Sequence, residues 1–351
     1  MAGHADSLHP EDGVWDAEHH RFLVGSLRHG TVSAVRPDGS VRTLVDDPEH
    51  LVSVIGIQLD RARGRVLVAN ADPGVGLRHD PAKVVAGIGA YDLETGQRLF
   101  YTDLAAVAAD GGRHFANDIA LGPGGEAYVT DSFSPLVYRV RPDGRASVLV
   151  RDDRLATPAG AFGLNGIVRI GSTLLIGKYD DGTLWRLALD RPAELRPVAV
   201  AGPRPIGLDG LLSTGGSTLR GVTNTLGGSG ADSLVDLRSP DGWRTAVLTV
   251  RAAADPAPTA LVAGPGGSVY ELSGRMDLLF QGCRTTGSRC VGCEPWNSTR
   301  RPSVSRRPGW TNCSRCSAWS GTSRPTVGSR CSRRVSRSTR SSTGSATSGS
   351  W

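Results

Sequence analysis

The stretch FANDIALGPGGEAYVTDS, residues 115–132, places an Asn-Asp pair before a short apolar run, a Gly-rich turn and a second apolar run. A similar arrangement recurs in units that begin near residues 13, 56, 117, 165, 209 and 259, mostly 43 to 50 residues apart. Each unit is predicted to form four short strands joined by tight turns, which is typical of a propeller blade.

These repeats predict an all-β fold, a six-bladed β-propeller, over residues 1–281. A β-sandwich or two stacked β domains are the alternatives for so many short strands. The sixth unit has two convincing strands before the composition changes. We therefore expect a truncated sixth blade and a gap with unpaired strand edges.

A second segment, residues 282–351, is a low-complexity basic tail with 13 Arg, no Lys, one Glu and all six cysteines. Its net charge is +12 and that of the whole chain is +6, so residues 1–281 carry −6 and no nucleic-acid partner is expected for the propeller. The abrupt change favours an out-of-frame reading of GC-rich DNA. The alternatives are a disordered tail and a zinc module, because CVGC at 290–293 and CSRC at 313–316 have zinc-ribbon spacing.

The N-terminal MAGHADSLHPEDG lacks an apolar core, so no signal peptide is predicted and a cytoplasmic location is expected. Secretion is the alternative if the start codon is misplaced. The sequence contains no run of about 18 apolar residues, so no membrane association is expected. The expected partner is a small-molecule substrate, bound by a monomer.

Four polar residues stand where a unit begins: Glu11, Asn117, Asn165 and Asp209. The first strand of every propeller blade lines the central channel, so these side chains are expected to converge at its mouth. Two carboxylates and two amides suit a hard divalent cation; Ca²⁺ fits best, and Mg²⁺, Mn²⁺ and Zn²⁺ are the alternatives. Asn-Gly and Asp-Gly are also common in turns, and it is their recurrence at one offset that favours a shared metal site.

The chain resembles the SMP-30/gluconolactonase/LRE-like family of six-bladed propellers over roughly residues 8–281. The resemblance rests on PEDGVWD, ANDIALGPGGEAYVTDS, GLNGIV and GLDGLL at matching spacing. It implies one divalent metal, usually Ca²⁺, held by Glu11, Asn117, Asn165 and Asp209. It also implies hydrolysis of a cyclic ester, with Asp209 as the acid/base.

Two departures from the family pattern are visible. The first motif reads Glu11-Asp12-Gly13, whereas the family usually has Glu-Gly-Pro or Glu-Gly-Val. Phe115 stands where sugar-lactone hydrolases of the family often carry Arg, which argues against a sugar acid lactone as substrate.

The predicted function is therefore metal-dependent lactone hydrolysis, in which a metal-polarised carbonyl is attacked by water and Asp209 takes the proton. Candidate substrate-binding residues near the channel mouth are His114, Asp131, Lys178 and Asn70, each of which also suits a turn, a blade edge or a loop. One alternative is a non-catalytic small-molecule-binding propeller with a structural metal. Another is a carbon–nitrogen or phosphoester enzyme, as in strictosidine synthase-like and phosphotriesterase-like propellers.

Overall fold

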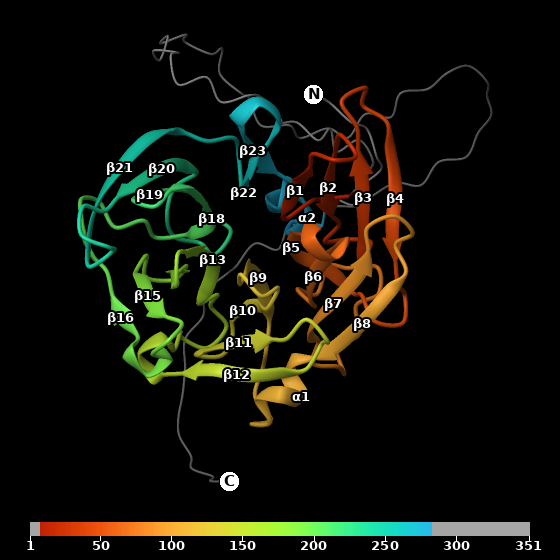
Figure 1. Cartoon of the computed structure of the whole chain (residues 1–351), viewed down its shortest axis with the longest axis horizontal. Helices are drawn as coiled ribbons and strands as arrows, with labels where there is room; N and C mark the ends of the chain where they lie inside the picture. Colours follow the sequence, from red (N-terminus) through yellow and green to blue (C-terminus); the bar gives the residue numbers. More distant parts are fainter. Residues whose placement is uncertain (1–7, 283–351) are drawn as a thin grey trace, which may run out of the picture. The chain divides into compact units, whose positions relative to one another are not determined.

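The computed structural model describes residues 8–282, which form an all-β propeller (Figure 1). Five sheets of at least four strands are followed by a sheet of two strands. The first sheet contains β1 Gly13–Asp16, β2 Arg21–Gly25, β3 Thr31–Val35 and β4 Val41–Asp46, and the second contains β5 Ser53–Asp60, β6 Arg65–Ala71, β7 Ala86–Asp92 and β8 Arg98–Asp103. The third contains β9 Ala116–Leu121, β10 Ala127–Asp131, β11 Leu136–Val140 and β12 Ala146–Arg151, and the fourth contains β13 Leu164–Ile170, β14 Thr173–Lys178, β15 Leu184–Ala188 and β16 Arg196–Pro197.

The last two sheets follow the same meander. Their strands are β18 Leu208–Gly215, β19 Thr218–Thr223, β20 Ser233–Arg238, β21 Thr245–Ala253; β22 Pro258–Ala263 and β23 Val269–Ser273. Two short α-helices are described, α1 Leu104–Ala108 and α2 Met276–Phe280. Among the described helices, none is long and apolar enough to cross a membrane.

The repeat seen in the sequence is also visible in the turns. Arg36–Gly39 and Arg141–Gly144 share the sequence Arg-Pro-Asp-Gly and join the third and fourth strands of their sheets. In both turns the glycine amide donates to the arginine carbonyl, at 2.9 Å, and the glycine has a φ near +87°. A left-handed backbone at this point favours glycine, which explains the Pro-Asp-Gly signature.

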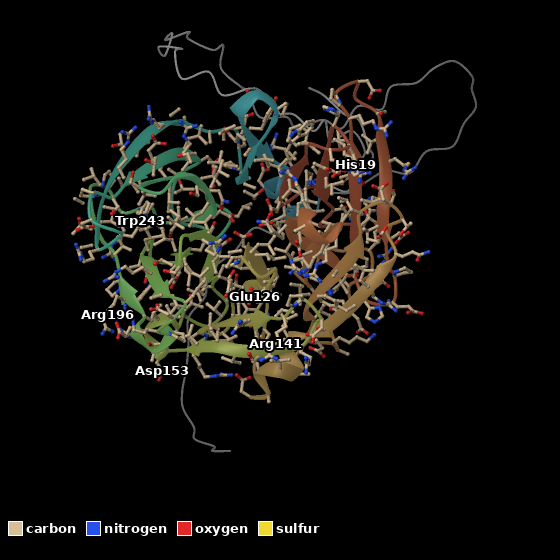
Figure 2. The ribbon with its side chains drawn as sticks, in the orientation of Figure 1. His19, Glu126, Arg141, Asp153, Arg196 and Trp243 are labelled. Atoms are coloured by element: carbon tan, nitrogen blue, oxygen red, sulfur yellow. The ribbon has the colours of Figure 1, made fainter. Side chains whose placement is uncertain are left out.

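Most of the hydrophobic cores lie between two neighbouring sheets. Val68 and Val32 belong to the core between the second and first sheets, and Leu67 and Val129 belong to the core between the second and third. Trp243, labelled in Figure 2, is 2% exposed, belongs to the core between the fourth and fifth sheets, and donates from Nε1 to the Gly216 carbonyl. Inner strands are therefore apolar on both faces, because each sheet is covered on both sides.

The inner wall of the propeller closes through the two-stranded sheet. β22 contacts both β18 and β1, so the first strands of all six sheets form a continuous ring. Phe22 and Tyr270 pack across the junction with ring centroids 5.1 Å apart, and Thr259 Oγ1 donates to the Glu11 carbonyl at 2.6 Å. The expected gap is thus closed at the channel wall. The sixth sheet has two strands among the described residues, and the number of blades, five or six, stays a prediction.

Two features differ from the expected repeat. Strand β17 (Ala199–Ala201), expected at the end of the fourth unit, pairs in parallel with β21 on the outside of the fifth sheet. Helix α2 follows β23, and its Met276 and Leu279 pack against Leu27 and Phe115 rather than continuing the sheet. The tail at 283–351, with CVGC and CSRC, lies outside the described residues, as do residues 1–7.

Candidate functional site

The site forms where the first strands meet around the channel. Six residues occupy equivalent places in the six units: Glu11, Ile55, Asn117, Asn165, Asp209 and Thr259. We call them the axial ring. The four residues proposed as metal ligands are members of it and line the same two cavities. The structure therefore brings these four together, and their role as ligands stays a prediction.

Irregular pairing produces this ring. The register of β5 with β6 shifts between Val54 and Ile57, and that of β13 with β14 shifts between Leu164 and Ile167. A bulge places two residues opposite one and turns the strand, so its side chains are aimed differently from those of a regular ladder. Ile55 and Asn165 each lie inside such a bulge.

The ring also depends on very close contact between backbones. A Cβ on Gly166 would lie 2.3 Å from the Asp209 carbonyl oxygen, and a Cβ on Gly56 would lie 2.3 Å from that of Asn117. No side chain fits at that distance. Where the backbone of the next strand approaches this closely, the residue that follows the member of the axial ring must therefore be glycine.

Replacing Gly166 with Ala is expected to lower the free energy of unfolding by about 2–3 kcal/mol, because the backbone that it meets cannot move aside easily. Gly216→Ala is the control, because Gly216 is exposed and an added Cβ there meets nothing within 4 Å. Urea unfolding of both variants measures the difference. Equal stability of the two variants would contradict the close packing of the ring.

Two further carboxylates lie next to the ring, Asp12 and Asp118, and they make matching bonds. Asp12 accepts the Gly13 amide at 2.7 Å and the Ile57 amide at 2.9 Å. Asp118 likewise accepts the Ile119 amide at 2.7 Å and the Ile167 amide at 2.9 Å. Each carboxylate thus joins one blade to the bulge of the next.

Four carboxyl groups consequently face one channel. Burial inside the propeller, followed by repulsion from Asp209 and the neighbouring carboxylates, raises the pKa of Glu11 well above its usual range. Burial raises the pKa of Asp118 to about 6 despite its two amide bonds. Burial, followed by repulsion from Asp118, also raises the pKa of Asp209 to about 7, although the side-chain amides of Asn224 and Asn165 favour its charged form. This accumulation of negative charge would be relieved by a bound cation.

Asp209 is held in one orientation with one oxygen left over. Its Oδ2 accepts a hydrogen bond from Asn224 Nδ2 at 2.6 Å. The Asn224 oxygen is itself held by the Tyr179 hydroxyl and by the Leu226 amide. Asp209 Oδ1 is buried and has no hydrogen-bond partner among the described residues. A buried carboxylate oxygen without a donor is costly unless a ligand satisfies it.

Asn117 is oriented in a similar way. Its Nδ2 donates to Ser132 Oγ at 2.9 Å, and Ser132 Oγ donates to the Leu164 carbonyl at 2.6 Å. The amide nitrogen is thereby committed, and the side-chain oxygen is the atom left for a ligand.

The donor chemistry fits a divalent cation. The axial ring offers carboxylate and amide oxygens, which are the ligands that Ca²⁺ and Mg²⁺ prefer. Among residues 8–282, no Lys or Arg forms an ion pair with Glu11, Asp12, Asp118 or Asp209. Arg61 and Arg169 line the channel, but they donate to backbone carbonyls of Trp15 and Leu121.

The ring separates two spaces. On one side lies the channel itself, about 480 Å³, lined by the first strands with Asp12 and Asp118. On the other side is a pocket of about 60 Å³ with apolar walls, which we call the apolar pocket. It is lined by residues from loops and from helix α2, among them Phe115, Phe162, Leu226, Met276 and Phe280.

His114, in the loop before β9, and Asp131, at the end of β10, do not belong to the axial ring. His114 Nδ1 bonds Asp131 Oδ2 at 2.8 Å, and its Nε2 bonds Asp110 at 2.9 Å. Burial disfavours the charged imidazole, but Asp131 and Asp110 outweigh it and raise the pKa of His114. Asp131 Oδ1 accepts three backbone amides, those of Phe115, Phe133 and Ser134. Neither residue lines the apolar pocket, but His114 lines a neighbouring groove of about 430 Å³.

Asn70 and Lys178 are also used within the scaffold. Fully buried Asn70 accepts the Val52 amide at 2.8 Å and donates to the Tyr101 hydroxyl at 2.8 Å. Lys178 Nζ pairs with Asp180 at 2.7 Å and Asp181 at 3.0 Å. Neither lines the channel or the apolar pocket, so the structure does not bring the four candidate substrate-binding residues to the ring.

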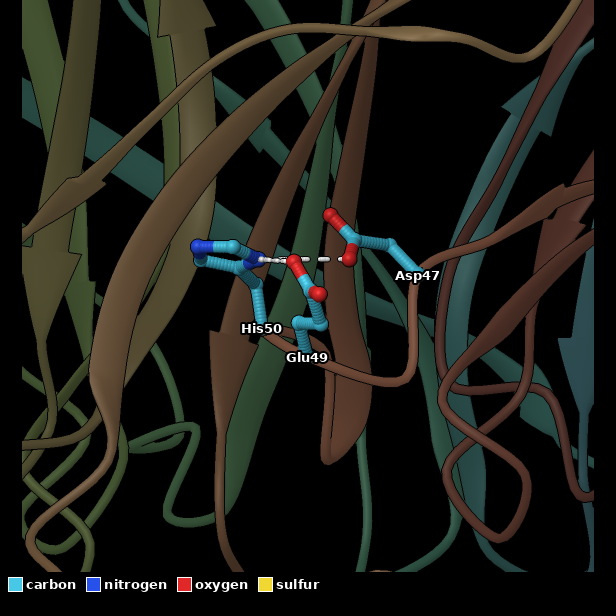
Figure 3. A group of neighbouring side chains, drawn as sticks. All are labelled: Asp47, Glu49 and His50. Carbon is cyan, nitrogen blue, oxygen red and sulfur yellow. Dashed lines mark hydrogen bonds and ion pairs between the residues drawn. The ribbon is translucent and has the colours of Figure 1, made fainter.

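A separate cluster of Asp47, Glu49 and His50 has ligand atoms within 4.8 Å of one another (Figure 3). Arg98 already supplies a positive charge there. Its Nη1 lies 2.9 Å from Asp47 Oδ2 and 3.7 Å from Glu49, and Tyr91 donates to the same Asp47 oxygen. The cluster is therefore satisfied as a structural ion-pair network.

Known proteins of several kinds are similar to this chain in fold. No protein-family profile matches the chain, and no curated protein sequence matches it. Among solved structures, the major allergen Mala s 1 of Malassezia sympodialis aligns with a TM-score of 0.67 at 16% identity, over 85% of this chain and 96% of that one. A gluconolactonase from Xanthomonas campestris and the calcium-binding protein regucalcin from Agrobacterium tumefaciens give 0.55 and 0.53, each at 16% identity over 77% of this chain and 84% of theirs. At this identity the likeness establishes the propeller fold.

Proposed function

We propose that this chain is a metal-dependent hydrolase of cyclic esters, a lactonase related to the SMP-30/gluconolactonase/LRE-like family. One observation carries the proposal: oxygen ligands from four blades converge at the channel, and the Asp209 carboxylate presents a buried oxygen without a partner. The sequence motifs at the blade starts support it. A gluconolactonase and a calcium-binding regucalcin among the structural neighbours also support it.

The proposed cation ligands are Glu11, Asn117, Asn165 and Asp209. Ca²⁺ is the proposed ion, with Mg²⁺, Mn²⁺ and Zn²⁺ as alternatives. When bound, a divalent cation supplies a Lewis acid for the ester carbonyl.

The chain's own groups provide the proton transfer. Asp209 Oδ1 is the proposed acceptor of the proton from the attacking water, because it is the carboxylate oxygen without a hydrogen bond. Asn224 holds the other oxygen, so the base keeps one orientation. The same Oδ1 then returns the proton to the alkoxide that leaves when the acyl–oxygen bond breaks. Water is thus added across the ester, and the product is a hydroxy acid.

The test uses the full chain, stripped with a chelator and then given Ca²⁺, Mg²⁺, Mn²⁺ or Zn²⁺, against a panel of lactones. Hydrolysis is expected only after an ion is restored, and pH-stat titration of the released acid measures it. Undiminished hydrolysis by the stripped protein would contradict metal dependence. A folded, metal-binding protein without turnover would favour a binding propeller with a structural ion instead.

A further inference from the structure

The apolar pocket borders the axial ring on the side away from the channel. Among its described lining residues there is no Lys, Arg or His. Its polar groups are the ring side chains and the Tyr179 hydroxyl, which is already bonded to Asn224 and to the Gly227 amide. Away from the axial ring the lining residues are apolar apart from Tyr179, so a ligand hydroxyl group placed there would lose its bonds to water without gaining new ones.

The walls are held rigidly by aromatic contacts. The rings of Phe115, Phe133 and Phe162 lie 5.1 to 5.3 Å apart, and Phe162 also meets Tyr179 at 6.4 Å. Arg113 stacks on Phe133 at 4.8 Å and does not line the apolar pocket. The side chain at position 115 is therefore a buried phenyl group beside the axial ring, and no cationic side chain lies in its place.

The apolar pocket is too small for a large ligand, but it does not end blindly. Pro73 and Phe162 line it and also line a second space of about 430 Å³, which we call the insertion groove. Residues 72–85 form one wall of this groove, including Pro81, Val84 and Val85. The groove is also lined by ionisable side chains, and each of them has a partner. His79 pairs with Asp72 at 2.8 Å and Lys83 with Asp80 at 3.4 Å. His114 pairs with Asp131 at 2.8 Å, and Arg113 stacks on Phe133.

Resting on the proposed lactone hydrolysis, we infer that the substrate is a cyclic ester with an apolar alkyl or aryl substituent. The ester ring occupies the apolar pocket beside Asp209. The substituent passes between Pro73 and Phe162 into the insertion groove. Phe162 is then a specificity-determining residue, because it contacts the ligand in both spaces. A hydroxylated sugar lactone is disfavoured by the walls of the apolar pocket.

Three lactones with the same six-membered ring test this inference: δ-decalactone, unsubstituted δ-valerolactone and glucono-δ-lactone. With the calcium-loaded full chain, kcat/KM is expected to be at least about tenfold higher for δ-decalactone than for δ-valerolactone. Glucono-δ-lactone is expected to be the poorest of the three. Calorimetry with the product acids gives a second readout, in which 5-hydroxydecanoate binds and gluconate does not.

Phe162→Ser is expected to reduce the preference for δ-decalactone over δ-valerolactone by about tenfold, while Phe162→Leu keeps most of it. Phe100→Ser is the matched control. Phe100 is a partly buried phenylalanine on β8 that packs beside Gly144 and lines neither space. Its loss should lower stability and leave the preference unchanged.

The outcomes separate the two proposals. Hydrolysis with glucono-δ-lactone preferred, or a preference that Phe162→Ser does not change, overturns the inference and leaves lactone hydrolysis standing. Binding of 5-hydroxydecanoate that Phe162→Ser abolishes, without turnover of any lactone, supports the pocket's chemistry and refutes the hydrolase. Neither turnover nor binding overturns both.

Discussion

The Asp209→Asn variant is expected to lose about 10²- to 10⁴-fold in kcat for the best lactone, which is the range for losing a general base. Asn keeps the shape and the oxygen that Asn224 would bond, but it cannot take a proton from water. Initial-rate kinetics at saturating Ca²⁺ measure the loss. The fold should survive, because burial raises the pKa of Asp209 to about 7 and the site tolerates a neutral side chain.

Asp236→Asn is the matched control for this substitution. Asp236 is also a buried aspartate of the fifth sheet, 4% exposed, but it pairs with Arg251 at 2.5 Å and lines neither cavity. Its replacement should lower stability and leave kcat near the wild-type value. Full activity in Asp209→Asn would show that another group takes the proton.

Calcium is expected to raise the melting temperature of the chelator-stripped chain by about 10 °C at pH 8 when it is present at about a thousand times its Kd. An ion bound at the axial ring of the folded state, as proposed, would relieve the repulsion among Glu11, Asp12, Asp118 and Asp209. At pH 5 the expected increase is only about 2 °C, because protons already occupy these carboxylates. Differential scanning fluorimetry across this pH range gives the comparison.

The direction in which the stability of the metal-free protein changes with pH follows from its pKa values. Asp118 and Asp209 have folded-state pKa values of about 6 and about 7, both raised from 3.8. Between about pH 4 and pH 7 the folded state therefore binds more protons than the unfolded state, and the free energy of unfolding falls as pH rises. A stripped protein that becomes more stable from pH 5 to pH 8 would contradict this account of the channel.

Glu11→Gln should remove most of the calcium effect at pH 8, because it takes one charge from the ring. Glu49→Gln is the control, because Glu49 belongs to the Arg98 network, has a side chain 76% exposed, and should leave the effect intact. The reverse pattern would move the calcium site to the cluster of Figure 3.

The repeat could be predicted from the sequence because a similar pattern of polar and apolar residues recurs where the first strand of a unit begins. The unit beginning at Asn117 falls on β9, and that beginning at Asp209 falls on β18, so the all-β propeller is confirmed. Strand switching could not be seen in this way. Residues 199–201 leave the fourth sheet for the edge of the fifth, and that choice depends on tertiary pairing rather than on local pattern.

The axial ring could be predicted in part, because some of its members recur at the same place in their units. Its four polar members share one offset, whereas Ile55 and Thr259 carry no signal of a site. Asp12 and Asp118 were missed, although a carboxylate follows the ring residue in both units. Their function in joining blades depends on amides of Ile57 and Ile167, which are far away in the sequence.

Asn224 was missed as well, because it reaches Asp209 across the fifth sheet from beyond the end of β19. Conversely, His114 and Asp131 look like site residues in the sequence; they bond to each other beside β9 and β10, His114 also lines the insertion groove, and their role in binding substrate stays a prediction. A short polar motif at a strand end serves equally well for a scaffold network or a ligand site. Only the neighbouring chain segments decide between them.

The most direct test of the central claim is to locate the ion. Crystals of the full chain soaked in Mn²⁺ should show one anomalous peak in the channel, bounded by Glu11, Asn117, Asn165 and Asp209. A channel without a peak, or a peak at Asp47, Glu49 and His50 alone, would contradict the proposed metal centre and the hydrolysis that depends on it.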